Sequence, residues 1–91
     1  MVVPPNFYHW RIFAGAEVDL ILERDGCFYP IEIKCKTNTT KSDGSGIKAF
    51  KASYPHVKVM PGLIIHAGLE RYPIEPDILA LPWNFHLKAK L

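Results

Sequence analysis

Two acids and one lysine within residues 15–36 are of residue types that could act together in catalysis. Asp19 lies in one stretch of alternating polar and apolar residues, while Glu32 and Lys34 lie in the next. Carboxylate oxygens are preferred ligands of Mg²⁺ and Mn²⁺. A nearby ammonium can support a nucleophilic water or stabilise charge on a phosphate. These residue types indicate metal-assisted hydrolysis if the fold brings them together.

A β-hairpin would bring them together. Residues 16–23 and 27–36 alternate with the period of a strand, and Asp25-Gly26 between them is a favoured two-residue turn because both residues tolerate positive φ. This turn fixes the register, which places Asp19 directly opposite Glu32. Opposed like charges cost a strand pair a few tenths of a kcal/mol to about 1 kcal/mol, so the pairing needs an explanation.

The same register predicts the two faces of the hairpin. The core face would hold three apolar pairs: Val18 with Ile33, Leu20 with Ile31, and Leu22 with Tyr29. The other face would hold Asp19 with Glu32, and Glu17 with Lys34. One explanation of this second face is a metal ion between the two acids. The other is a solvated face with a Glu17–Lys34 ion pair and two tolerated acids, and the residues alone leave both open.

The remaining segments predict one small α/β domain spanning residues 1–91. The expected elements are a strand at 7–13, a polar loop at 37–46, a helix at 45–54 with Ile47, Phe50 and Tyr54 buried, one strand or two pieces broken at Pro61-Gly62 within 57–68, an edge strand at 69–75, and an apolar tail at 77–85 that packs near the surface or against a partner.

Composition excludes several classes of protein. With 48% hydrophobic and 22% charged residues the chain is globular. No apolar run approaches the roughly 20 residues of a membrane span, and the N-terminus lacks the pattern of a signal peptide, so we expect a cytoplasmic protein without a membrane contact. Cys27 and Cys35 are expected to be buried, reduced thiols. The four histidines have no zinc-ligand spacing.

Positive charge is concentrated in residues 34–58. This segment holds six lysines against a single acid, although the whole chain carries only +2. Such a stripe suits the phosphates of a nucleic acid. It also suits an ordinary solvated helix face, and both interpretations remain open.

The paired stretches "EVDLIL" and "IEIK" resemble the core signature of the PD-(D/E)XK nuclease superfamily. The wider text, "FYHWRIFAGAEVDLILERDGCFYPIEIKCK", "IKAFKASYP" and "ILALPWNF", resembles the C-terminal domain of unknown function of prokaryotic predicted AAA+ ATPases over about residues 7–85. The resemblance implies a restriction-endonuclease-like α/β fold, a mixed sheet flanked by helices that lacks the first core helix. It also implies that Asp19 and Glu32 bind Mg²⁺ (or Mn²⁺), that Lys34 assists the attacking water, and that Glu17 is a candidate further ligand.

On this hypothesis the domain would hydrolyse DNA, with the backbone contacted by Arg11, Lys36, Lys41, Lys48 and Lys51. No nucleotide cofactor is expected, because no Gly-x-x-x-x-Gly-Lys-Ser/Thr loop occurs. The chain also has no acid before Glu17, so either an oligomeric partner completes the fold or the chain is a fragment of a longer ATPase-linked protein. We expect a homodimer, since a sheet without its first covering helix exposes apolar surface.

Two alternatives to the nuclease remain. The domain could be a catalytically inactive interaction module that docks to an AAA+ ATPase or self-associates, because folds are often reused without their chemistry. It could also bind DNA without cleaving it.

Overall fold

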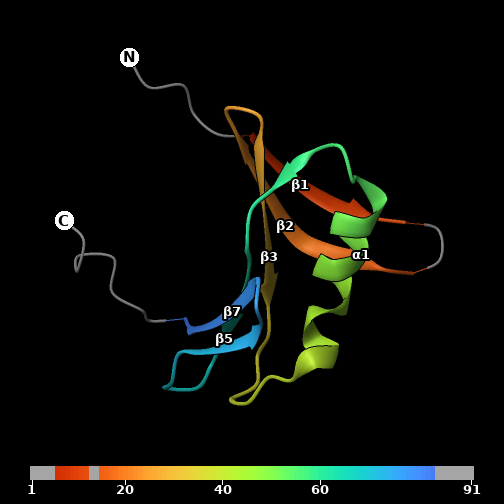
Figure 1. The fold of residues 1–91 in the computed structure, drawn as a ribbon. Helices are drawn as coiled ribbons and strands as arrows, with labels where there is room; N and C mark the ends of the chain where they lie inside the picture. The colour runs from red at the N-terminus through yellow and green to blue at the C-terminus, as the bar shows by residue number, and fades with distance from the viewer. Residues whose placement is uncertain (1–5, 13–14, 84–91) are drawn as a thin grey trace.

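A computed structural model describes residues 6–12 and 15–83 of the chain. Seven strands and one α-helix follow one another in the order shown in Figure 1. The elements are β1 (Asn6–Arg11), β2 (Glu17–Arg24), β3 (Cys27–Ile33), a 3-10 turn η1 (Lys41–Gly44), α1 (Ser45–Ser53), β4 (Lys58–Val59), β5 (Gly62–His66), β6 (Tyr72–Glu75) and β7 (Ile78–Pro82).

The strands form one mixed sheet in the order β1-β2-β3-β5-β7-β6, with the short β4 beside β3. β3, β5 and β7 are parallel, and the strands beyond them on either side are antiparallel. Helix α1 covers one face (Figure 1). The predicted fold class is confirmed: an α/β fold with a mixed sheet, consistent with a restriction-endonuclease-like arrangement that lacks a helix. No helix among residues 6–12 and 15–83 is long and apolar enough to cross a membrane.

The core lies between α1 and the sheet. It is built from Trp10, Val18, Ile21, Ile47, Phe50, Ile64 and Ile78. Ile47 reaches the sheet at Gly62, where a Cβ atom would lie only 2.7 Å from the Ile47 side chain. The absence of a side chain at Gly62 therefore lets the helix approach β5 closely.

The predicted hairpin register is confirmed for the five pairs nearest the turn. Arg24 pairs with Cys27 and Leu22 with Tyr29, and the ladder continues to Leu20 and Ile31. Both turn residues have positive φ, 54° at Asp25 and 79° at Gly26, as a two-residue turn of this kind requires.

The predicted core face is wrong. Helix α1 packs on the opposite face of the hairpin, where Phe28 contacts Phe50 and Ile21 is only 2% exposed. A β-bulge explains why Val18 is nevertheless buried with Ile21: Trp10 pairs with Val18 and Tyr8 with Ile21, so β2 has one more residue than β1 between these pairs. The bulge shifts the alternation of β2, which a strict period of two does not anticipate.

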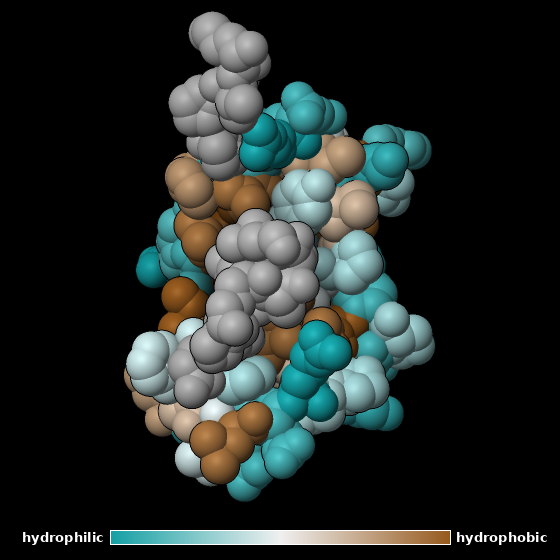
Figure 2. Space-filling view, turned by 90° about the vertical axis from the view of Figure 1, so that its left-hand side faces the viewer, coloured by the Kyte–Doolittle hydropathy of each residue, from teal (hydrophilic) through white to brown (hydrophobic). Residues whose placement is uncertain are grey.

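The face turned away from α1 is a continuous apolar surface that we call the open face. Sheet pairing aligns its residues across four strands: Leu20, Leu22, Tyr29, Ile31, Ile33, Leu63, Ile65, Leu79 and Leu81. Figure 2 views this side of the molecule and shows hydrophobic residues in several patches on it. Parallel strands are usually covered on both faces, and among the described elements no helix covers this one.

Other elements agree more closely with the predictions from the sequence. The helix ends at Ser53, just before Tyr54 and Pro55, and Ile47 and Phe50 are buried while Tyr54 is 40% exposed. Residues 57–68 form two strands broken at Pro61, and β6 is an edge strand as predicted.

The tail was predicted to pack near the surface or against a partner. Instead, its residues Ile78–Pro82 form β7, inside the sheet between β5 and β6. Trp83 after it is 69% exposed, and Phe85 lies outside the described residues. Both thiols are free, but Cys27 is only partly buried and Cys35 is exposed, so their predicted burial is wrong.

Candidate metal centre

The hairpin brings Asp19, Glu32 and Lys34 together at one end of β2 and β3. The backbone N–H of Ile33 donates to Asp19 Oδ2 at 2.8 Å, and the N–H of Asp19 lies 3.4 Å from Glu32 Oε1. Each carboxylate is thus held by the backbone of the opposite strand. The backbone of Lys34 is fixed in turn, because its N–H donates to the carbonyl of Ile65 on β5.

Glu32 is buried although it is an acid. Its residue is 6% exposed. Burial, followed by the hydrogen bond and the charge of Asp19, raises the pKa of Glu32 to about 7, an effect that the charge of Lys34 partly offsets. A divalent cation would favour the ionised form of such a carboxylate pair.

The start of α1 closes the site from above the sheet. A Cβ atom on Gly46 would lie 2.7 Å from Glu32 Oε2 and 2.1 Å from the carbonyl oxygen of Glu17. Only glycine fits at this position without moving the helix. Gly46 therefore sets how closely the first turn of α1 approaches the Glu32 carboxylate.

The 3-10 turn η1 anchors that first turn. Asp43 Oδ2 accepts a hydrogen bond of 2.8 Å from the backbone N–H of Thr40, and Lys36 Nζ lies 3.0 Å from the same oxygen. Burial alone would raise the pKa of Asp43, but the Thr40 N–H and the Lys36 ammonium outweigh it and hold the pKa below its usual value. Asp43 therefore remains ionised beside the site.

These groups line a polar hollow of about 200 Å³. Its walls are formed by Gly15, Ala16, Glu17, Asp19, Glu32, Lys34, Ser42, Asp43, Ser45 and Gly46. Mg²⁺ commonly binds through one or two carboxylates and keeps several waters. The donor set of Asp19 and Glu32 in a hollow of this polarity therefore fits Mg²⁺ or Mn²⁺.

Glu17 does not join the two acids. Its Oε1 lies 3.4 Å from His9 Nε2 and 3.5 Å from Arg11 Nε, both on β1. The predicted Glu17–Lys34 ion pair is therefore wrong, because the register of β1 places the Arg11 guanidinium and the His9 imidazole beside Glu17. Within residues 6–12 and 15–83, no three His, Cys, Asp or Glu side chains lie close enough to share a metal ion.

A comparison with protein families matches residues 2–85 to a domain of unknown function, DUF4143. The chain belongs to the DUF4143 family. Uncharacterized proteins of Mycobacterium bovis and Mycobacterium tuberculosis are each 27% identical to this DUF4143 domain over 82 residues, which is 90% of the chain and 18% of the relative. The chain thus spans less than a fifth of the length of these curated relatives. No solved structure matches it.

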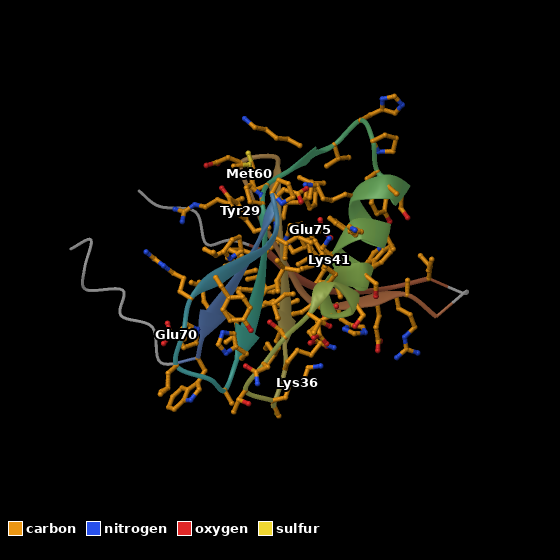
Figure 3. The ribbon with its side chains drawn as sticks, turned by 60° about the horizontal axis from the view of Figure 1, so that its bottom comes forward. Tyr29, Lys36, Lys41, Met60, Glu70 and Glu75 are labelled. Carbon is orange, nitrogen blue, oxygen red and sulfur yellow. The ribbon has the colours of Figure 1, made fainter. Side chains whose placement is uncertain are left out.

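Most of the basic residues expected to contact DNA in this DUF4143 domain lie beside acids. Arg11 contacts Glu17 and Lys36 contacts Asp43, while Lys48 contacts Glu75 at 3.0 Å and Lys51 contacts Asp77. Lys41 differs, since it makes no ion pair with any residue that the structure describes. Figure 3 shows Lys41 next to the start of α1 and Lys36 on the loop that leads there.

Several residues of the site were not anticipated from the sequence of this DUF4143 domain. Ser42 and Asp43 fall in the segment predicted as a loop without regular structure, and Ser45 and Gly46 lie where that loop and the predicted helix overlap. A local signal was present, because Thr40 followed three residues later by Asp43 is the pattern of a capping box before a helix. That pattern places the helix start but does not indicate which carboxylate the helix approaches.

Proposed function

We propose that this domain is a nuclease of the PD-(D/E)XK type that hydrolyses phosphodiester bonds of DNA with Mg²⁺ or Mn²⁺. One observation supports the proposal above others. Asp19, Glu32 and Lys34 face one polar hollow at the start of α1, where two acids and a lysine from the same hairpin meet. The family-level resemblance of "EVDLIL" and "IEIK" to the superfamily signature agrees with this arrangement.

Each residue has a distinct role in this proposal. Asp19 and Glu32 hold the cation, and the N–H of Ile33 orients Asp19 for it. Lys34 holds the attacking water or the charge that develops on the phosphate. When bound, the metal ion supplies Lewis acidity toward the phosphate and lowers the pKa of a bound water.

Isosteric substitutions test the proposal best, because removing a buried carboxyl would leave a cavity as well. Asp19→Asn, Glu32→Gln and Lys34→Met are compared with wild type on plasmid and oligonucleotide DNA in Mg²⁺ and in Mn²⁺. Cleavage should fall at least about 100-fold in each variant. Glu70→Gln is the control, because Figure 3 places Glu70 on the other side of the sheet from α1, and it should cleave as wild type does.

Metal binding is measured separately by calorimetry, since a protein can bind Mg²⁺ without hydrolysing DNA. Metal-dependent cleavage that survives in all three variants would contradict the proposed residues. Absence of both cleavage and metal binding in the wild type would contradict the nuclease itself.

A second candidate function is an inactive interaction module. The observation that favours it is the open face, whose apolar residues on three parallel strands have no covering helix among the described elements. Ile33 on this face is 56% exposed, although Leu81 is buried. Contiguous exposed apolar surface marks protein interaction sites. An AAA+ ATPase linked to the domain is the partner that the sequence resemblance implies. Co-purification with such an ATPase, lost in Ile33→Lys and retained in Asp19→Asn, would support this function.

A further inference from the structure

Strand β1 offers an open edge for pairing. Among the residues that the structure describes it pairs only with β2, so its other side presents unpaired backbone groups. The opposite edge strand, β6, contains Pro73 and an irregular register between Pro73 and Glu75, two features that hinder further pairing. β1 contains no proline and a single formally charged residue, Arg11. Of the two edges, β1 is therefore the one suited to accept a strand.

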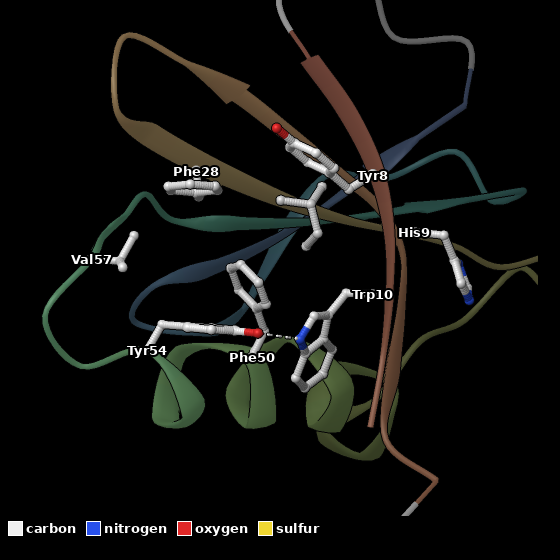
Figure 4. A pocket seen from close by; sticks show the side chains of 8 residues that line it. Tyr8, His9, Trp10, Phe28, Phe50, Tyr54 and Val57 are labelled. Atoms are coloured by element: carbon white, nitrogen blue, oxygen red, sulfur yellow. Dashed lines mark hydrogen bonds between the residues drawn. The ribbon is translucent and has the colours of Figure 1, made fainter. Parts of the chain in front are cut away.

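The side chains of β1 are also unusually apolar for an edge. Phe7 is 60% exposed and Tyr8 49%. Tyr8 and Trp10 line a cavity of about 390 Å³ between the sheet and the end of α1, opposite Phe50 and Tyr54. Figure 4 shows these two rings projecting from β1 toward the cavity, while His9 points away from it.

We propose that β1 pairs antiparallel with β1 of a second copy of this chain, so that the two sheets become one. The strand is self-complementary about a two-fold axis at His9. In that register Tyr8 lies opposite Trp10 of the second copy, and Phe7 lies opposite Arg11 of the second copy. Directly opposed residues share a face, so the aromatic pair lies on the cavity side and covers the exposed ring of Tyr8.

The charges on β1 suit this partner. The Arg11 side chain, which is 68% exposed, can reach the ring of Phe7 across the axis, and a cation over an aromatic face is attracted to it. No two formal charges of the same sign oppose each other. Aromatic cross-strand pairs each add roughly 0.2–1 kcal/mol to a strand pair. The pairing uses the backbone edge of β1 and no residue of the metal centre, so it stands independently of the nuclease proposed above.

A self-crosslink tests the register. In a Cys27→Ser, Cys35→Ser background, His9→Cys places one thiol of each copy at the axis. Directly opposed Cα atoms of an antiparallel pair lie about 4.5–5.5 Å apart, within the range that a disulfide bridges. Mild oxidation at low protein concentration should then give a covalent dimer at least tenfold faster than for Leu69→Cys, a control residue that is 86% exposed and lies outside the strands. Equal rates for the two variants would overturn the proposal.

Charge variants test the pairing without crosslinks. Phe7→Lys sets a lysine opposite Arg11 of the second copy, so the dissociation constant measured by sedimentation should rise at least tenfold. Leu69→Lys, which adds the same charge elsewhere, should leave it unchanged. A wild-type chain that remains monomeric at all concentrations overturns the proposal. A dimer lost in Ile33→Lys but kept in Phe7→Lys also overturns it, because that result would assign the interface to the open face.

Discussion

The backbone of Gly46 lies against the carboxylate of Glu32, close enough that a methyl group on Gly46 would lie 2.7 Å from Oε2. The same methyl group would lie 2.1 Å from the backbone carbonyl of Glu17. Alanine is favoured over glycine in a helix by about 1 kcal/mol, but a backbone atom cannot move aside as a side chain can. We therefore expect Gly46→Ala to lower the free energy of unfolding by about 2–3 kcal/mol and to weaken Mg²⁺ binding.

Gly44→Ala is the matched control for this prediction. Its added methyl group would meet side chains and no backbone: it would lie 3.0 Å from the end of Ile78 and 3.8 Å from the end of Ile64. A flexible terminus can shift, so the loss in urea denaturation should be smaller, below about 1 kcal/mol. Equal stability of the two variants would show that the close approach of α1 does not constrain the site.

The pH dependence of stability should report the buried carboxyl of Glu32. Its pKa rises from an ordinary 4.5 to about 7 in the folded state, so the folded protein holds this proton more tightly than the unfolded chain does. The contribution to stability is full below the unfolded pKa of 4.5 and is lost as pH rises through about 7. Without metal, the wild type should lose on the order of 3 kcal/mol across this window, as measured by urea denaturation.

Glu32→Gln should flatten that profile, because its amide does not titrate. The carboxyl groups of Asp43 and Asp77 do not obscure the effect, since their pKa values are lowered and their contributions are lost only as the pH falls into the acid range. Glu70→Gln serves as the exposed control and should keep the wild-type profile. A wild-type profile that is level between pH 5 and about pH 8 would show that Glu32 is not protonated in the apo fold.

The indole of Trp10 depends on Tyr54 for its hydrogen bond. Trp10 Nε1 donates to Tyr54 Oη at 3.1 Å, and Trp10 is buried. Tyr54→Phe should cost about 1 kcal/mol and lower the Tm by roughly 4–8 °C, because a buried donor loses its partner. Tyr8→Phe removes a hydroxyl at the same cavity that makes no side-chain hydrogen bond in the described part of the chain, and its Tm should hardly change.

Lysines that already contact acids should contribute little to DNA binding. Lys41→Ala should weaken binding and reduce its salt dependence by about one counterion. Lys48→Ala should have a smaller effect, since Lys48 must leave Glu75 before it can contact a phosphate. Fluorescence anisotropy at several salt concentrations measures both. A larger loss for Lys48 than for Lys41 would contradict this prediction.

Local pattern was sufficient to predict the hairpin, its register and the meeting of Asp19 with Glu32. The Asp25-Gly26 turn fixes the pairing through backbone geometry alone, and this information is entirely local. The break before Gly62 and the end of α1 at Ser53 were likewise marked by prolines. These features need no knowledge of the rest of the fold.

Features that depend on contacts between distant segments were not predictable in this way. Val18 turns to the face that α1 covers because of a bulge in β2 opposite β1. The run Ile78–Pro82 becomes an interior strand only because β5 lies beside it. The side chain of Glu17 contacts His9 and Arg11, which lie on β1. This contact depends on the register between β1 and β2, which the sequence of neither strand predicts by itself.

The position of β7 has a consequence for synthesis. It is the last described strand in the chain, yet it lies between β5 and β6 and pairs with both. Before β7 is synthesised, the β1-β2-β3 meander can form and β5 can pair with β3, but β5 lacks its second neighbour and β6 has no strand to pair with. Since non-local pairing is slow and leaves strand edges exposed, the nascent chain should depend on chaperones until Ile78–Pro82 emerge.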